Sequence, residues 1–524
     1  MTTAIDVQFY GFLFFIWLIS TLLIQSFIKK RSKSQAAPSV LHPPSPPALP
    51  IIGHLHVLSL NLPKSFKNLA SKYGPLMRIN IGASACFVVS NAAVAKEILK
   101  THDLSFASRP EFGSSDYSIY RGSRFLTAEY GTYWRFMRKI CMTELLSASQ
   151  LSRFIDVREQ EIMRLMEILV KRSGAGEVCD LGAELMTMAN NVVCRMAMST
   201  RCTESADEAA EVRGLVKEIL KLGGKLSLGE VLGPLKKFDL FGFGKRLRAL
   251  LLQFDALVEG IMMEHEKKRI DGGREKKDMM DILLEIYRDE TAEVKLSRND
   301  IKSLFLDIFL AGTETMSVAM QWTLAELINH PQVFKKLREE IDSVLGPTKL
   351  VEESDIPNLP YLQSVVKESL RLHPPAPLLI RQCREDCRIN GYDILENSRI
   401  LINLYSVMRD PDLWKDPAEF VPERFLVSSI ENFGDQQQKE IRDQIFHYIP
   451  FGSGRRACPG ASLVAAVMHV AIGALVQCFD WKIKGGDQKL NMEEGLGFSA
   501  GMTSPLACYP IIRINPLEIT LLSK

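Results

Sequence analysis

One cysteine stands in a loop that is rich in glycine and arginine. The loop reads FGSGRRACPG, residues 451–460, and places Cys458 beside Arg455 and Arg456. Glycines let a backbone fold tightly around a sulfur atom and aim N–H groups at it, and arginines can pair with negative groups. Three kinds of chemistry fit this loop: phosphate binding, nucleophilic attack by a thiol, and metal binding by a thiolate.

The loop taken alone leaves these three kinds of chemistry open. Residues 452–457, GSGRRA, match a permissive dinucleotide fingerprint, and Asp480 follows at about the ribose-binding distance of roughly 20 residues. However, the tail after Asp480 contains no convincing second βαβ crossover. A nucleophilic thiol would need a base, for which His447 is a candidate by sequence proximity only. A single thiolate without companion ligands suits haem iron better than zinc or an iron–sulfur cluster.

The remaining composition narrows the classes of function. The ten cysteines are scattered without a CxxC pair, which indicates a reducing compartment with mostly buried thiols. Cys383 and Cys387 are four residues apart, but no second Cys/His pair follows at zinc-finger spacing, so a zinc site is not expected. The net charge is +2 and no basic stripe with interleaved aromatics occurs, which excludes nucleic acid as an expected partner.

A second stretch with possible chemistry spans residues 297–331. A capping-box pattern at its start and a His-Pro stop at its end predict a single helix of roughly 50 Å. Its middle holds Ala311 and Gly312, followed by Glu314 and Thr315. A glycine inside a helix costs about 1 kcal/mol relative to alanine. It indicates either close helix packing or room for a flat ligand, with a carboxylate and a hydroxyl able to pass protons.

Two further stretches are unremarkable when taken alone. ESLR places Glu368 and Arg371 at i, i+3 on a short helix, and FVPERF places Arg424 in a loop. Surface pairs of the first kind are common and contribute only a few tenths of a kcal/mol.

The elements that position these residues begin with an apolar N-terminal run. Residues 9–28 form 20 residues without a charge, which is the length of one bilayer crossing. Asp6 is the only charged residue before the run, and a basic cluster of residues 29–33 follows it. This order favours a retained anchor over a cleaved secretory signal and places the rest of the chain on the cytosolic side.

The rest of the chain is predicted to be one large body. Residues 29–50 form a basic and proline-rich hinge that ends in PPSPPALP, a stiff spacer. From residue 51 to residue 524 helical periodicity dominates, while LMRINIG, CFVVS and RILINLY read as short strands. The fold class is therefore mainly α with a small β component.

The motifs AGTET, ESLR, FVPERF and FGSGRRACPG stand in this order behind an anchor and a proline hinge. In this combination the chain resembles a cytochrome P450 of the plant microsomal type over essentially its whole length. GTYWRFMRKICMTELL, SDIPNLPYLQSVVKESLRLHPP and GFSAGMTSPLACYP further resemble one small plant family close to the flavone and isoflavone synthases. Members of that small family oxidise pentacyclic, friedelane-type triterpenoids or strigolactones.

The resemblance implies a haem b cofactor and a residue set that holds it. Cys458 would be the proximal thiolate ligand, Phe451 would pack against the ligand loop, and Gly454 and Gly460 would let the backbone approach the sulfur. The haem propionates would be bound by a further group of side chains from three parts of the chain: Trp134, Arg138, Arg381 and Arg456.

The resemblance also assigns roles to the other motifs. Glu368, Arg371 and Arg424 would form a buried triad that locks the core behind the haem. Ala311 and Gly312 would leave space for dioxygen, and Glu314 and Thr315 would deliver protons. The family often has Asp at the acid position and Ser or Thr after the threonine, so Glu314 and Met316 are mild departures from its pattern.

The implied reaction is insertion of one oxygen atom from O₂ into a C–H bond. Electrons would come from NADPH–cytochrome P450 reductase in the endoplasmic reticulum membrane, docking on the cysteine side, with Lys439, Arg442 and Arg455 as candidate contacts. The apolar pocket segments are expected at 109–130, 306–311, 376–380 and 498–504. They favour a triterpenoid methyl group, oxidised stepwise to the acid, with a strigolactone or flavonoid as the alternative. A membrane haem protein used only for electron transfer is the rival class.

Overall fold

The structure is a computed structural model, and it describes fifteen parts of the chain: residues 14, 17–18, 20–21, 40–49, 52–82, 84–111, 113–201, 208–229, 239, 241–270, 277–291, 294–426, 446–486, 489–495 and 499–522. Most of the predicted anchor (1–28) and the basic part of the hinge therefore lie outside the described residues. The same is true of Lys439 and Arg442.

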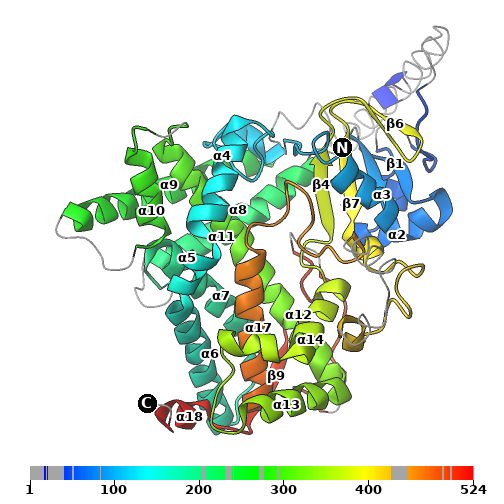
Figure 1. The fold of residues 1–524 in the computed structure, drawn as a ribbon. Helices are drawn as coiled ribbons and strands as arrows, with labels where there is room; N and C mark the ends of the chain where they lie inside the picture. The colour runs from blue at the N-terminus through cyan, green and yellow to red at the C-terminus, as the bar shows by residue number, and fades with distance from the viewer. Residues whose placement is uncertain are drawn as a thin grey trace, which may run out of the picture.

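The described residues form a large helical part beside a smaller part that contains the main sheet (Figure 1). The helices are α2 Leu62–Tyr73, α3 Ala92–Lys96, α4 Thr132–Ile140, α5 Ala148–Arg153, α6 Ile155–Ala175, α7 Leu181–Met198, α8 Glu208–Gly229, α9 Phe243–Ile270, α10 Met279–Arg288, α11 Arg298–Gly312, α12 Glu314–Asn329, α13 Pro331–Leu345, α14 Pro360–Leu372, α15 Leu404–Val407, α17 Ala461–Cys478 and α18 Pro516–Leu522. The strands are β1 Leu76–Ile81, β2 Ser84–Val89, β3 Cys179–Asp180, β4 Leu378–Gln382, β5 Cys387–Ile389, β6 Tyr392–Ile394, β7 Arg399–Asn403, β8 Phe479–Ile483 and β9 Ala507–Ile512.

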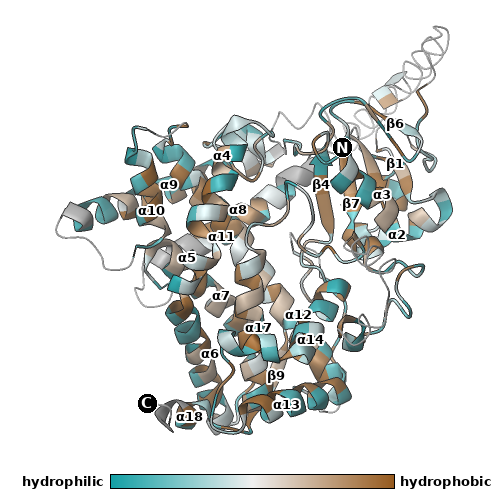
Figure 2. Ribbon diagram, in the orientation of Figure 1, coloured by the Kyte–Doolittle hydropathy of each residue, from teal (hydrophilic) through white to brown (hydrophobic). Residues whose placement is uncertain are grey.

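The main sheet has the strand order β1-β2-β7-β4. The strands predicted from LMRINIG and CFVVS are confirmed as β1 and β2, and the first five residues of RILINLY form β7, while Leu404 and Tyr405 begin helix α15. β2 and β7 pair in parallel, and β4 pairs antiparallel with β7, which sets Arg381 opposite Ile400. Figure 2 shows hydrophobic residues along β4 and hydrophilic residues on outer helices such as α9 and α2.

The most apolar helices lie in the core. Among the described residues, two helical stretches are long and apolar enough to cross a membrane, Arg298–Asn329 and Ala461–Cys478, and 72% of the most apolar window of each is buried. Burial of this extent is typical of the central helices of a globular body, where every face meets other apolar side chains.

The prediction of one uninterrupted helix over 297–331 is wrong at Thr313. The predicted capping box is present, since Ser297 accepts from the Asp300 N–H and Asp300 accepts from the Ser297 N–H. The helix then stops at Gly312, and a second helix starts after Thr313. The Thr313 hydroxyl donates to the Phe309 carbonyl oxygen at 2.9 Å, which competes with the regular helical bonding next to a glycine.

Candidate functional site

The Cys458 loop folds back on itself immediately before α17. The Cys458 N–H donates to the Phe451 carbonyl oxygen at 3.0 Å, and the Ala457 N–H donates to the Gly454 carbonyl oxygen at 3.0 Å. The backbone N–H groups of Gly460 and Ala461, at the start of α17, lie close enough to the Cys458 thiol to favour its ionised form. The sulfur therefore lies at the positive end of a long helix, where a thiolate is favoured.

The Cys458 side chain is reachable by solvent yet enclosed by protein atoms on most sides. Enclosure is the largest effect and raises the pKa of the Cys458 thiol. The Gly460 and Ala461 N–H groups and the charges of Arg138 and Arg109 act in the opposite direction and favour the thiolate.

The glycines of the loop are explained by two different contacts. Gly454 has φ +72°, and a Cβ there would lie 2.3 Å from an Asp103 carboxylate oxygen and 2.7 Å from the Leu99 carbonyl oxygen. The close approach at Gly454 is thus to residues 99–103 and not to the sulfur, which corrects the expectation from the sequence. At Gly460 a Cβ would be 3.9 Å from the Cys458 sulfur, an ordinary contact.

Four arginines gather around this cysteine: Arg109, Arg138, Arg381 and Arg456. Burial, with the charges of Arg109 and Arg456, lowers the pKa of Arg381 to about 9. Burial, with the charges of Arg109 and Arg138, lowers the pKa of Arg456 to about 9. Guanidinium groups keep their charge even in unfavourable surroundings, so the cluster calls for a negatively charged partner.

Backbone carbonyls satisfy only part of this arginine cluster. Arg456 Nε donates to the Ala107 carbonyl oxygen at 2.6 Å, and Arg138 Nη1 donates to the Ala457 carbonyl oxygen at 2.8 Å. Nη2 of Arg381 and Nε of Arg109 are buried with no hydrogen-bond partner among the described residues. Each such donor costs about 1–3 kcal/mol unless a partner reaches it.

The Trp134 ring closes one side of the arginine cluster. The Arg456 guanidinium lies 4.4 Å from the centroid of this ring, and the ring of Phe125 stacks on it with centroids 5.9 Å apart. A cation over an aromatic face is stabilised and held in orientation. Trp134 therefore positions Arg456.

The junction of α11 and α12 holds the residues that the sequence assigns to dioxygen space and proton delivery. Ala311 is exposed there although the preceding turns of α11 are almost entirely buried, and the Thr315 hydroxyl donates to the Ala311 carbonyl oxygen at 2.6 Å. Gly312 faces Val193 on α7, since a Cβ at Gly312 would lie 3.3 Å from a methyl group of that side chain. Gly312 thus serves helix packing, and only Ala311 of the pair faces open space. Met316 is fully buried in the core.

Glu314 is the carboxylate beside this junction. Its partial burial raises the pKa of Glu314, and the charge of Lys217 on α8 offsets part of that effect. A carboxyl group with a raised pKa binds and releases protons closer to neutral pH than an exposed one does.

Asp307 on α11 ties the loop after residue 118 to the site, and the sequence analysis missed it. Its carboxylate accepts from Arg124 Nε at 2.7 Å and from the Leu126 N–H at 2.9 Å. Its charge also acts on Arg109, which in turn feels the charge of Cys458. The one signal in the sequence was a lone carboxylate in the apolar run SLFLDIFL. No sequence motif indicated that Arg109 interacts with Asp307 and Cys458; only the structure shows this.

Segments expected to form a pocket meet at α12. The Ala500 N–H donates to the Pro375 carbonyl oxygen at 2.9 Å, and the Trp322 indole N–H donates to the Ala500 carbonyl oxygen at 2.7 Å. A Cβ at Gly501 would lie 3.5 Å from a Val318 methyl group. The 375–376 turn and the 499–501 segment are therefore neighbours along one side of α12.

Comparison with known proteins identifies the family that carries this arrangement. The sequence model described as Cytochrome P450 matches residues 43–508. The chain belongs to the cytochrome P450 family. Its members are haem-thiolate monooxygenases whose iron is ligated by a cysteine.

Plant P450s are the relatives at high identity. The chain is 43% identical to 3,9-dihydroxypterocarpan 6A-monooxygenase of Glycine max, covering 96% of this chain and 98% of that protein. It is 42% identical to beta-amyrin 24-hydroxylase of Glycine max, with 98% and 99% covered. It is 44% identical to cytochrome P450 705A5 of Arabidopsis thaliana, with 98% and 99% covered. Plant P450s are typically microsomal and generally use NADPH–cytochrome P450 reductase.

A solved structure shows the same fold. A zebra fish cytochrome P450 with abiraterone superposes with a TM-score of 0.71 at 24% identity, covering 86% of this chain and 99% of that one. The mainly helical P450 fold is thereby confirmed.

The residues around Cys458 fit a haem. The prosthetic group carries two propionate carboxylates, and the site offers a thiol together with four arginines, two of which hold buried N–H groups with no partner among the described residues. An iron ligand together with an excess of positive charge matches the donor needs of this group.

Glu368, Arg371 and Arg424 lie in contact in this P450. Arg371 donates to both Glu368 oxygens, at 2.7 and 2.8 Å, and Arg424 Nε donates to one of them at 3.1 Å. The Val421 N–H adds a bond at 2.9 Å. The remaining Arg371 donors bind backbone carbonyl oxygens on three residues of the 408–419 segment: Met408, Pro417 and Glu419. The triad thus anchors this long loop to α14.

Arg455, the more exposed arginine of the loop, has a structural partner. Its Nη1 donates to an Asp103 carboxylate oxygen at 2.6 Å, and its Nε donates to the Tyr130 hydroxyl at 3.2 Å. Arg455 therefore fastens the cysteine loop to two neighbouring segments.

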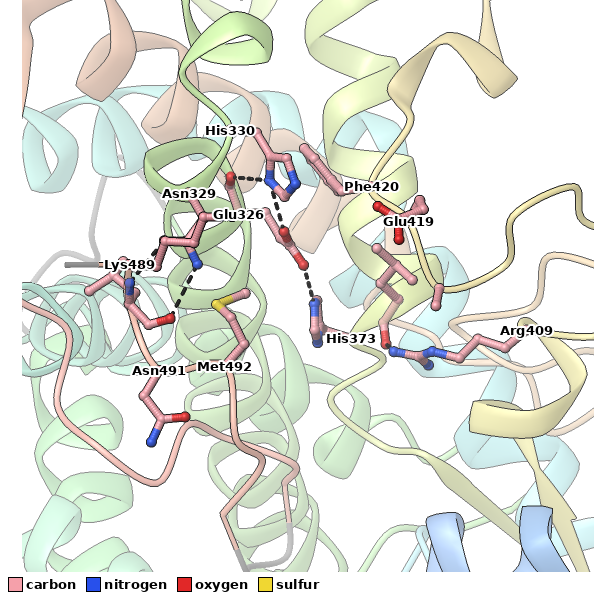
Figure 3. A pocket seen from close by; sticks show the side chains of 13 residues that line it. Glu326, Asn329, His330, His373, Arg409, Glu419, Phe420, Lys489, Asn491 and Met492 are labelled. Atoms are coloured by element: carbon pink, nitrogen blue, oxygen red, sulfur yellow. Dashed lines mark hydrogen bonds and ion pairs between the residues drawn. The ribbon is translucent and has the colours of Figure 1, made fainter. Parts of the chain in front are cut away.

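A cavity of about 510 Å³ lies at the far end of α12, where Glu326 meets His330 and His373 (Figure 3). His373 Nε2 bonds to Glu326 Oε1 at 2.6 Å, and His330 Nδ1 lies 3.2 Å from Glu326 Oε2. Despite burial, these imidazoles lower the pKa of Glu326 to about 2. Glu326 follows Thr315 by eleven residues, roughly 16 Å along a helix. The cavity is therefore lined by other residues than the Cys458 loop and lies about three turns of helix beyond Thr315.

Proposed function

We propose that Cys458 supplies the iron ligand of this P450 and that the enzyme oxidises a pentacyclic triterpenoid of the friedelane type. The observation that carries the ligand assignment is the sulfur of Cys458 at the start of α17, near four arginines, two of which hold buried N–H groups without a partner among the described residues.

Haem bound through a thiolate activates O₂ and supplies the oxygen atom that enters a C–H bond. The chain's own residues hold that group and control protons. Arg381 and Arg109 have donors free for propionate oxygens, and Arg456 and Arg138 surround the same site. Phe451 and Gly460 shape the loop on either side of the sulfur.

Proton delivery is assigned to Thr315 and Glu314. The Thr315 hydroxyl group is fixed because it donates a hydrogen bond to the Ala311 carbonyl oxygen. The hydroxyl oxygen can still accept a hydrogen bond from a donor on the exposed side. Glu314, with a raised pKa, can supply a proton at neutral pH more readily than an ordinary carboxyl group. A haem protein used only for electron transfer would need neither group.

The substrate proposal rests on the apolar character of the walls and on the relatives. Asp307 is already bonded to Arg124 and Leu126, so it is not free to anchor a polar substrate group. A pocket with few polar groups suits a large lipophilic ring system. One relative is named for hydroxylating beta-amyrin, a pentacyclic triterpene. We favour a methyl group as the position, oxidised in steps through alcohol and aldehyde to the acid.

The alternative substrate class is a flavonoid or a strigolactone. Another relative is named for a pterocarpan, a compound of the flavonoid class. The placement of the chain in a small family beside the flavone and isoflavone synthases belongs to the same proposal, as does its single-pass anchor, residues 9–28, in the endoplasmic reticulum membrane. The reductase would dock on the cysteine side, where Arg455 is exposed.

The test uses the full chain in microsomes that also contain the reductase. Reduced microsomes bound to CO should show the thiolate-type difference spectrum, and Cys458→Ser should abolish it while leaving the protein detectable by immunoblot. A surviving spectrum would defeat the ligand assignment. Incubation with NADPH and separate panels of friedelane triterpenes, flavanones and strigolactones then identifies the substrate class; product from flavanones or strigolactones alone would replace the triterpenoid proposal.

A further inference from the structure

Cys383 and Cys387 lie side by side although neither belongs to the haem site. Their sulfur atoms are 3.6 Å apart, and both are free thiols. A disulfide needs the sulfurs at about 2.05 Å, so closing the pair requires a movement of about 1.5 Å. Movement on this scale is within the reach of a short loop.

The two thiols differ in access to solvent. Cys383 follows strand β4 and is fully buried, and its backbone is fixed on both sides, since its N–H donates to the Ser398 carbonyl oxygen at 2.9 Å and its carbonyl accepts from the Asn397 N–H at 2.8 Å. Cys387 begins strand β5 and is partly exposed. The pair therefore combines one sulfur that a small reagent can reach with one that is held behind it.

The hydrogen bond between the sulfurs distributes one proton unevenly. Donation from Cys387 lowers the pKa of the Cys383 thiol, and the same bond raises the pKa of Cys387. The Cys383 sulfur also lies 3.0 Å from the Glu385 carbonyl oxygen. Thiolates are the reactive form in thiol–disulfide exchange, so the buried Cys383, which ionises more readily and lies 3.6 Å from the Cys387 sulfur, is placed to act as the resolving cysteine.

The loop that carries the two thiols is bonded to the segment beneath the arginine cluster. We call residues 383–387 the thiol strap. Within it, the Arg384 N–H donates to the Ser105 carbonyl oxygen at 2.8 Å, and Glu385 accepts from the Ser105 hydroxyl at 2.7 Å. Two residues further along that segment, the Ala107 carbonyl oxygen accepts from Arg456. A movement of the strap is thus passed to the residues that support the cysteine loop.

We propose that Cys383 and Cys387 form a reversible redox site, which closes to a disulfide by exchange with a small disulfide such as oxidised glutathione and moves the thiol strap. This inference stands on the thiol geometry and does not depend on the substrate of the enzyme.

The exchange balances in two steps. The Cys387 sulfur, after passing its proton to Cys383 or to water, attacks glutathione disulfide; a protein–glutathione bond forms and one glutathione leaves. The Cys383 sulfur then attacks the Cys387 sulfur, the protein disulfide forms, and a second glutathione leaves. Overall the two cysteines lose two electrons and two protons, and one glutathione disulfide becomes two glutathiones.

The experiment uses the haem-loaded full chain in detergent micelles, equilibrated with glutathione buffers from fully reduced to fully oxidised and then blocked with N-ethylmaleimide under denaturing conditions, so that buried thiols are labelled too. Trypsin cuts after Arg384 and places the two cysteines on different peptides, so a bond between them appears as one linked peptide pair. We expect the linked pair to accumulate in oxidising buffers and to disappear with dithiothreitol. Amide exchange at Arg384 and at 104–108 should change in parallel.

Internal and engineered controls make the outcome decisive. Cys179 and Cys508 are partners across β3 and β9, but both are buried, so they should remain labelled as thiols throughout. Cys383→Ser should trap glutathione on Cys387, whereas Cys387→Ser should form neither product. Thiol labelling of both Cys383 and Cys387 in every buffer would overturn the proposal, and a linked pair with unchanged amide exchange would overturn the coupling to the arginine cluster.

Discussion

The substitution Glu368→Gln removes one negative charge from the interior while keeping the size of the side chain. Glu368 and Arg371 both have a side-chain exposure of 0%, and Arg424 has 13%. The carboxylate accepts four hydrogen bonds, from Arg371 twice, from Arg424 and from the Val421 N–H. A glutamine amide can accept at one position only and turns its NH₂ group toward donors at the other.

The magnitude follows from the charge that is left behind. Arg371 keeps its three backbone carbonyl partners but loses its one carboxylate contact within the part of the chain that the structure describes. Breaking a buried ion pair in this way costs about 3–5 kcal/mol, because the remaining charge stays out of water. At 1.4 kcal/mol for each factor of ten, the folded-to-unfolded ratio should fall about 100-fold to 4,000-fold. Most domains have only about 5–15 kcal/mol in total.

The assay compares haem-loaded protein with total protein. Microsomes carrying the full-length wild type or Glu368→Gln are measured by the CO-difference spectrum and by immunoblot, and the rate of spectral loss is followed at rising temperature. A rate is used because proteins of this size commonly unfold irreversibly. We expect little haem-loaded variant at growth temperature and rapid loss of what does form.

The matched control is Glu339→Gln on the surface of α13. Glu339 is 65% exposed and lies 3.7 Å from Lys335, an i, i+4 surface pair. Its loss should change the stability by no more than about 0.5 kcal/mol. If Glu368→Gln retains haem and resists heating as well as Glu339→Gln does, the reasoning about the buried triad is refuted.

Three further outcomes are expected. Thr315→Ala should retain the haem spectrum but consume NADPH with several-fold less product, because a hydroxyl on the exposed side of the helix junction is lost; product per NADPH equal to wild type would remove its proposed role. Asp307→Asn should free the segment near Arg124, since a charged acceptor of two bonds is weakened; limited trypsin treatment should then cut there faster, and an unchanged cutting rate would contradict the anchoring role. Glu326 has a pKa of about 2 against an ordinary 4.5, so its ionised form stabilises the fold above about pH 4.5, and this contribution shrinks as the pH falls toward 2. The difference in heat stability between wild type and Glu326→Gln should be larger at pH 7 than at pH 4. A difference that is the same at both values would contradict the lowered pKa of Glu326 and the role of its hydrogen bonds with His330 and His373.

Local sequence patterns were enough to predict the fold class. The strands β1 and β2 follow from β-branched and apolar residues in short runs, and the capping box at Ser297 is a contact between residues three apart. The prediction failed inside the long helix, because Thr313 bonds back to Phe309 and interrupts a regular apolar pattern. The pattern alone does not show which of two competing local hydrogen bonds forms.

The sequence indicated which glycines matter, but it did not show which contacts require a glycine at those positions. At Gly312 the sequence left helix packing and ligand space open, and the neighbour that decides is Val193, more than a hundred residues earlier. At Gly454 the deciding neighbours are Leu99 and Asp103. Contacts between distant segments depend on how whole elements pack, and a single sequence does not record them.

By itself the sequence determined the family of this protein, and with it the fold, the haem and the monooxygenase class. The reason is that the cysteine loop and the three other motifs are short, continuous runs of residues, which can be recognised without knowing which distant residues are in contact. Only the tertiary structure decided that Arg109 joins the arginines around Cys458, that Asp307 fastens a distant loop, and that the Cys383 and Cys387 sulfurs lie 3.6 Å apart. The physical reason is that charge, burial and hydrogen bonding act through space. Residues with unremarkable neighbours in the chain therefore acquire their chemistry only when the chain is folded.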